Sequence, residues 1–79
     1  MKKQQLTAIK LFTDVGMCTT YYKLPRAGNV IICFIDPDGW FGVSNQEDLE
    51  PSFPINLDEY DINIMTQEEF DRKYPNENT

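Results

Sequence analysis

The longest apolar run in the chain, Val30 to Ile35, has six consecutive hydrophobic residues. A run of this length suits a strand that is buried on both faces or central in its sheet. The next four residues, Asp36-Pro37-Asp38-Gly39, are a turn signal, because aspartate can bond the turn backbone, proline restricts φ and glycine tolerates positive φ. Trp40 to Val43 then resumes the apolar pattern. The sequence therefore predicts a β-hairpin over residues 30–44.

Apolar and polar residues alternate near the C-terminus, from Tyr60 to Met65. A period of two is typical of a half-buried strand. Thr66-Gln67-Glu68-Glu69 follows with the residue types of a capping box, in which the threonine hydroxyl and the glutamate carboxylate each accept a hydrogen bond from a backbone amide. We therefore expect a short helix over residues 67–74, which Pro75 ends.

The remaining segments give less uniform signals. Residues 17–24 contain a cluster of β-favouring side chains and predict another strand. Residues 6–13 fit either a strand or a helix that Gly16 would end, and their β-branched residues favour the strand. Residues 45–57 are expected to form a long connection, because Pro51 and Pro54 remove backbone donors and the acidic residues favour solvent. Its apolar residues are expected to pin it to the core: Leu49, Phe53 and Ile55.

These elements predict a single α+β domain over residues 1–79, with a small antiparallel sheet of about four or five strands and one short C-terminal helix at about 67–74. Two pairs of adjacent aromatic residues, Tyr21-Tyr22 and Trp40-Phe41, must point to opposite faces of their strands. Either the terminal helix and the 45–57 connection cover the second face, or aromatic side chains remain exposed as a contact surface.

The composition excludes several kinds of chemistry. The chain has no histidine, which rules out Ser–His and Cys–His catalytic pairs and histidine-ligated metal sites. Two cysteines without histidine cannot complete a structural zinc site, and we expect Cys18 and Cys33 to be reduced, buried and inert. The expectation is therefore no catalytic residue, no metal and no cofactor, and an enzyme that uses a pair of carboxylates is the least favoured alternative.

Charge is distributed unevenly along the chain. Residues 1–26 have five basic side chains and one acid, a net charge of +4, whereas residues 27–79 have twelve acids and two basic side chains, a net charge of −10. This imbalance favours a partner with a basic surface and argues against nucleic acid or an anionic membrane as the ligand.

Six acids in and beside the 45–57 connection are the candidates for a partner-binding patch: Glu47, Asp48, Glu50, Asp58, Glu59 and Asp61. We expect the first five of them to lie near one another, because the connection returns the chain to the edge of the sheet. Trp40 and Tyr22 are the candidate aromatic contacts of the same interface. Such a patch can imitate nucleic-acid phosphates and block a nucleic-acid-binding protein. The alternative is a solvated face that only maintains solubility.

The function expected from these features is non-enzymatic protein binding. The module would dock on a basic surface of a larger partner and inhibit or regulate it, like small proteins of mobile elements and phages. The alternative is a structural or accessory protein that self-associates, for example as a homodimer, through a sheet edge. No apolar run is long enough to span a bilayer and no secretion signal is apparent, so the cytoplasm is the expected compartment and no membrane partner is expected.

Overall fold

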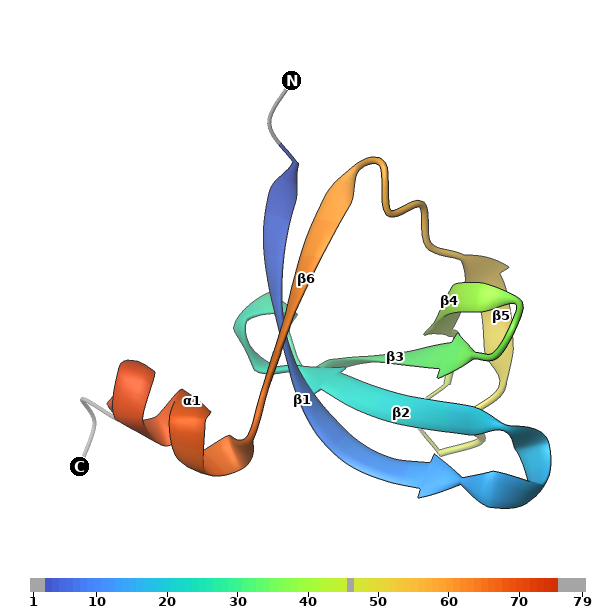
Figure 1. The fold of residues 1–79 in the computed structure, drawn as a ribbon, viewed down its shortest axis with the longest axis horizontal. Helices are drawn as coiled ribbons and strands as arrows, with labels where there is room; N and C mark the ends of the chain where they lie inside the picture. The colour runs from blue at the N-terminus through green and yellow to red at the C-terminus, as the bar shows by residue number, and fades with distance from the viewer. Residues whose placement is uncertain (1–2, 46, 76–79) are drawn as a thin grey trace.

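The computed structural model describes residues 3–45 and 47–75, which form a curled six-stranded sheet and one α-helix (Figure 1). The strands are β1 (Gln4–Asp14), β2 (Thr19–Leu24), β3 (Val30–Ile35), β4 (Gly39–Val43), β5 (Pro51–Pro54) and β6 (Tyr60–Met65). Two 3₁₀ turns, η1 (Val15–Met17) and η2 (Pro25–Ala27), join β1 to β2 and β2 to β3, and α1 spans Gln67–Lys73. The α+β class is thus confirmed, and the segment 6–13 is a strand rather than a helix.

The expected antiparallel sheet of four or five strands was wrong in two respects. The sheet has six strands in the order β5-β4-β3-β2-β1-β6, and β6 runs parallel to β1. The additional strand is β5, which lies inside the segment expected to be a connection and pairs with β4. Its prolines are compatible with pairing because β5 is an edge strand, where one side of the backbone needs no partner.

The predicted β3–β4 hairpin is confirmed, with Cys33 opposite Phe41 across the antiparallel ladder. The turn between the strands covers residues 36–38, and its Asp36–Pro37 peptide bond is cis. Gly39, the first residue of β4, has φ of +98°.

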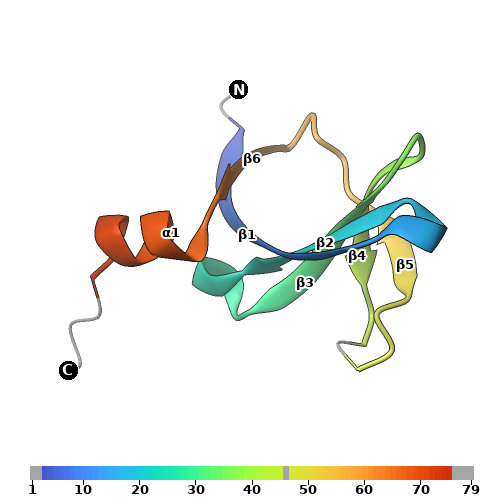
Figure 2. The ribbon, with the colours of Figure 1, turned by 60° about the horizontal axis from the view of Figure 1, so that its bottom comes forward.

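Curling of the sheet begins in β1. Residues 4–9 of this strand pair with β6, whereas residues 9–14 pair with β2, and the register shifts between Lys10 and Phe12. A bulge of this kind bends a strand and increases its twist. The two edge strands β5 and β6 are consecutive in the chain and are joined only by residues 55–59, so the sheet closes partly on itself (Figure 2). It has a concave and a convex face.

Each face carries its own buried cluster. The concave face buries Ala8, Leu24 and Ile32, with half-buried hydrophobic residues packed against them: Leu6, Tyr22, Trp40, Ile55 and Ile62. The convex face buries Tyr21, Ile31, Cys33 and Val43, with Ile35, Phe41 and Leu49 packed against them. The central strand β3 supplies buried residues to both faces, as its uninterrupted apolar run predicts.

The adjacent aromatic residues are therefore divided between two packed faces. On the convex side, the turn at residues 47–49 covers Tyr21, whose hydroxyl donates a hydrogen bond to the Leu49 carbonyl over 2.9 Å. The connection thus provides the expected cover. The helix does not, because α1 supplies none of the described residues in either cluster and instead contacts β1. Beyond its last turn, the Tyr74 ring lies 4.2 Å from the guanidinium carbon of Arg26.

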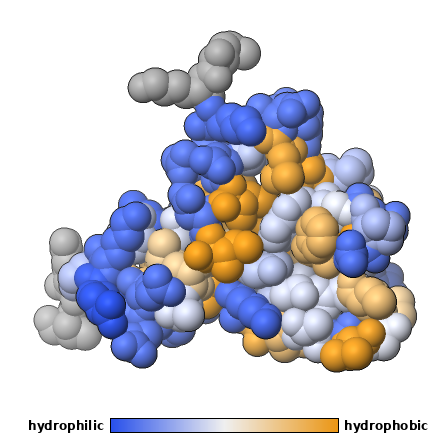
Figure 3. Space-filling view, in the orientation of Figure 1, coloured by the Kyte–Doolittle hydropathy of each residue, from blue (hydrophilic) through white to orange (hydrophobic). Residues whose placement is uncertain are grey.

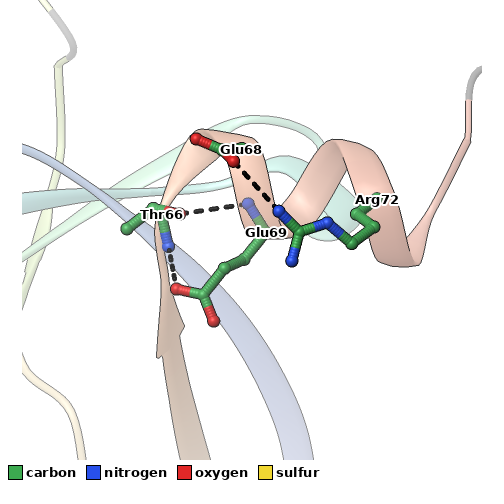
Figure 4. A network of polar contacts seen from close by, with 4 residues as sticks. All are labelled: Thr66, Glu68, Glu69 and Arg72. Atoms are coloured by element: carbon green, nitrogen blue, oxygen red, sulfur yellow. Dashed lines mark hydrogen bonds and ion pairs between the residues drawn. The ribbon is translucent and has the colours of Figure 1, made fainter.

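The start of α1 is set by its capping box (Figure 4). The Glu69 amide donates to the Thr66 hydroxyl over 3.0 Å, and the Thr66 amide donates to the Glu69 carboxylate over 3.2 Å. One turn later, Arg72 forms an ion pair with Glu68 at 2.9 Å. The predicted helix start is confirmed, and the helix ends one residue before the predicted position, with Tyr74 as its C-cap.

Replacing Thr66 by alanine should lower the free energy of unfolding by about 1 kcal/mol, because the Glu69 amide loses its side-chain acceptor. Thr66→Ser keeps the hydroxyl and serves as the matched control. Chemical denaturation of the three proteins measures the effect. Equal losses in the alanine and serine variants would contradict a capping role for the hydroxyl.

Candidate functional site

The six candidate acids are all exposed, but the structure divides them into two groups. Glu47, Asp48 and Glu50 form the first acidic turn, between β4 and β5. The second acidic turn consists of Asp58 and Glu59, which lead into β6, together with Asp61, the second residue of β6. The extended strand β5 separates the two turns, which lie at its opposite ends (Figures 1 and 2). The expectation that Glu47, Asp48 and Glu50 lie near Asp58 and Glu59 was therefore wrong.

Each acidic turn is organised by an asparagine at its beginning. In the first, the Asn45 side chain accepts a hydrogen bond from the Glu47 amide over 2.8 Å and donates one to Asp48 over 3.0 Å. In the second, the side-chain oxygen of Asn56 accepts a hydrogen bond from the Asp58 amide over 2.9 Å, and the backbone carbonyl of Asn56 accepts one from the Glu59 amide over 3.0 Å. Asparagine bonds its own following backbone in this way in many turns. The loops therefore present their carboxylates on locally ordered backbone.

Within the described residues, no carboxylate of the two acidic turns forms an ion pair. Over residues 3–45 and 47–75, the ion pair between Arg72 and Glu68 is the only one, and it lies in α1. Asp61 accepts a hydrogen bond from the Gln5 side chain over 3.0 Å, and Gln5 in turn accepts one from Asn63. An amide partner positions the Asp61 carboxylate without cancelling its charge, so both acidic turns contribute to an outward negative field.

The two aromatic candidates, Trp40 and Tyr22, take part in the concave core. Their ring centroids are 5.0 Å apart, and Trp40 also meets Phe34 with centroids at 5.3 Å. Burial raises the pKa of the Tyr22 hydroxyl. Both side chains are half-buried, so the structure gives them a packing role and places them on strands rather than in the acidic turns.

The sequence did not predict an apolar cleft of about 360 Å³ that opens on the concave side. It is lined chiefly by Leu6, Leu24, Ile32, Phe53, Ile55 and Tyr60, and two polar residues of the second acidic turn, Asn56 and Glu59, also line it. Figure 3 shows hydrophobic surface gathered over β6, with hydrophilic surface beside it. The cleft therefore combines an apolar floor with two polar residues, one of which is acidic.

Two residues of the expected connection form one wall of this cleft. Ile55 packs on the concave core, and its amide donates to the Trp40 carbonyl over 2.7 Å, as expected of a residue that pins the connection. Phe53 remains 54% exposed and covers Gly42. A Cβ atom at Gly42 would lie 2.2 Å from the Phe53 ring, so glycine in β4 is what allows the ring to occupy this position.

A second apolar surface lies at the tip of the β1–β2 hairpin. Its exposed hydrophobic residues are Leu11, Phe12, Val15 and Met17. Cys18 at the same tip is exposed, so the expectation that it is buried was wrong. Cys18 is the C-cap of η1 and has a φ of 51°, so its backbone does not have the extended conformation of a strand. Cys33 is buried as expected, and burial raises the pKa of its thiol.

Within the described part of the chain, no three cysteine or carboxylate side chains are grouped so that they could hold a metal ion. None of the described helical segments has the length and apolar character needed to cross a membrane. Comparison with protein-family models, curated proteins and solved structures finds no match.

Proposed function

We propose that this chain is a non-enzymatic protein-binding module of the cytosol that docks on the basic surface of a larger partner and inhibits or regulates it. The observation that carries the proposal is the exposure of six acids in two ordered turns, none of which has an ion-pair partner among the described residues. Uncompensated charge of one sign accelerates encounter with a surface of the opposite sign.

The cleft gives the proposed interface an anchor. Protein interfaces combine a buried apolar centre with a polar margin, and most of the binding energy comes from a few central contacts. Glu59 belongs to both the second acidic turn and the cleft lining, which joins the two features at one place. The second acidic turn is therefore the favoured docking side. Imitation of nucleic-acid phosphates by the acids is a more specific form of the same proposal.

Self-association through a sheet edge is the second candidate function. The observation that favours it is β6, an edge strand without proline. Pairing two copies along β6 would, however, bring together two sets of acids, at Asp58, Glu59 and Asp61. Like charges facing each other across strands are destabilising, so a basic partner fits this edge better than a second copy does.

Neutralising either acidic turn should slow association with the partner and flatten its dependence on salt, because steering depends on the summed field. One variant carries Glu47→Gln, Asp48→Asn and Glu50→Gln, and the other carries Asp58→Asn, Glu59→Gln and Asp61→Asn. We expect the larger effect from the second, because it includes Glu59, which lines the cleft. Folding stability should be unchanged or slightly higher, since exposed acids contribute little and crowded like charges repel.

The measurement starts with affinity capture and mass spectrometry to identify the partner, followed by association rates across ionic strengths. A control variant with the same change of net charge carries Asp38→Asn, Glu68→Gln and Asp71→Asn, at positions in the β3–β4 turn and in α1. If association slowed equally in all three variants, the effect would come from the net charge of the protein and not from the position of the acids. Unchanged affinity and salt slopes in both acidic-turn variants would leave the acids as a solubility feature and reject the proposal.

A further inference from the structure

The outer edge of β6 lacks most of the features with which edge strands usually avoid pairing. Natural edges are commonly short, bulged, or protected by proline and lysine. At the opposite edge, β5 has only four residues, with a proline at each end. By contrast, β6 has six residues and contains neither proline nor lysine. Of the two sheet edges, β6 is therefore the one suited to accept another strand.

The hydrogen-bond register shows which backbone groups of β6 are open. The Gln4 amide donates to the Glu59 carbonyl over 3.0 Å, and Gln4 lies opposite Tyr60. In a parallel ladder, a residue bonds to the two neighbours of its partner and not to the partner itself. In this register, Glu59, Asp61 and Asn63 bond to β1, and the N–H and C=O groups of Tyr60, Ile62 and Ile64 point away from it.

The same three residues place apolar side chains on the concave face. Tyr60 lines the cleft, Ile62 packs against the concave core, and Ile64 is 53% exposed. A strand added beside β6 would continue the sheet, and its alternate side chains would extend over this apolar surface. Open backbone groups and uncovered apolar side chains thus occur along one edge.

The negative charge in and before β6 indicates which residue type should alternate with the apolar residues of the added strand. Residues 55–65 include three acids and no basic residue. Asp61 lies on the face of the sheet that carries Gln5 of β1 and Asn63 of β6, opposite to the cleft side, and Asp58 and Glu59 come just before β6. A guest strand with basic residues at the positions that do not face the cleft would meet Asp61.

We propose that β6 binds an extended segment of the partner by strand addition, and that this segment alternates apolar and basic side chains. Its apolar residues cover the concave cleft, and its basic residues face Asp61 on the opposite side of the sheet. Main-chain hydrogen bonds provide affinity in this recognition mode, and alternate side chains provide specificity. The inference rests on the proposed function and specifies how the basic partner is held.

A synthetic peptide with alternating valine and lysine is the first probe. Its binding should slow hydrogen exchange at the amides of Tyr60, Ile62 and Ile64, which NMR resolves residue by residue. One control peptide alternates valine and glutamate, and another has the valines and lysines in two separate blocks. Failure of the alternating valine–lysine peptide to bind, equal binding of the block peptide, or protection confined to other residues would each overturn the proposal.

Backbone methylation of the peptide tests the ladder without changing the protein. One peptide carries N-methyl groups on its valines and another carries them on its lysines. A strand turns the amides of alternate residues toward opposite edges, so only one of the two sets faces β6. One methylated peptide should therefore bind about tenfold more weakly than the other, whichever direction the guest strand runs. Equal affinities would contradict strand addition.

A pair of protein variants links this test to the natural partner. Ile64→Pro removes an amide directed away from β1, whereas Ile64→Val keeps the amide with a similar side chain. Circular dichroism checks that both variants fold, and the proline variant should bind the captured partner about tenfold more weakly than the valine variant. Equal binding of these variants, together with a charge-dependent partner, would reject strand addition and leave the proposed function standing. The opposite pair of results would reject the proposed function: the peptide slows hydrogen exchange in β6, but neutralising the acids does not change binding of the captured partner.

Discussion

Replacing Ile32 by alanine should lower the free energy of unfolding by about 3 kcal/mol, the typical cost of truncating a fully buried isoleucine. Ile32 is 1% exposed and belongs to the buried concave cluster together with Ala8 and Leu24. The loss combines the transfer energy of the removed methyl groups with the cavity they leave. A domain of this length has roughly 4–12 kcal/mol of stability in total, so the variant should be severely destabilised.

The matched control is Ile64→Ala, which removes the same atoms from a side chain that is 53% exposed. Its loss should stay below about 1 kcal/mol, because less apolar surface is returned to water. Urea denaturation of both variants provides the comparison. Similar losses at the two positions would mean that the concave cluster is not the core on which the sheet depends.

Replacing Gly39 by alanine should cost about 1–2 kcal/mol through backbone strain. Gly39 begins β4 with φ of +98°, a conformation that residues with a Cβ atom rarely adopt. A Cβ atom here would meet no surrounding group within 4 Å, so a clash cannot account for the loss. The difference in denaturation midpoint from the unaltered protein measures the strain directly.

Gly16→Ala is the control for Gly39→Ala. Gly16 is not among the glycines with positive φ, and a Cβ atom there would lie 3.6 Å from the Asp14 carboxylate, an ordinary contact. The control should leave stability unchanged or raise it slightly, since alanine reduces the freedom of the unfolded chain. If the two variants lose the same stability, the positive φ at Gly39 is not the source of the effect.

Local signals in the sequence predicted the elements that depend on neighbouring residues. The β3–β4 hairpin follows from an apolar run, a turn and a second apolar run. The start of α1 follows from Thr66 and Glu69, whose reciprocal hydrogen bonds span only three residues. The prediction of β6 rests on its period of two. In each case, the hydrogen bonds or the buried face can be inferred from a short segment alone.

The candidate site was predicted only in part. The sequence identifies the acids and their excess over basic residues, and asparagine-led turns are a known way to expose such side chains. It did not reveal that β5 divides the acids into two turns, or that Phe53, Ile55 and Tyr60 line a cleft. These arrangements depend on strands that meet from distant parts of the chain.

The sequence by itself determined the α+β class, the central hairpin, the capped helix and the excess of acidic charge in residues 27–79. Only the tertiary structure decided that β6 pairs in parallel with β1, that two prolines lie in the edge strand β5, and that a cleft opens between these edges. The physical reason is the range of the interactions. Turns and caps are stabilised by bonds between neighbouring residues, whereas strand pairing and curling depend on burying both faces of the whole sheet at once.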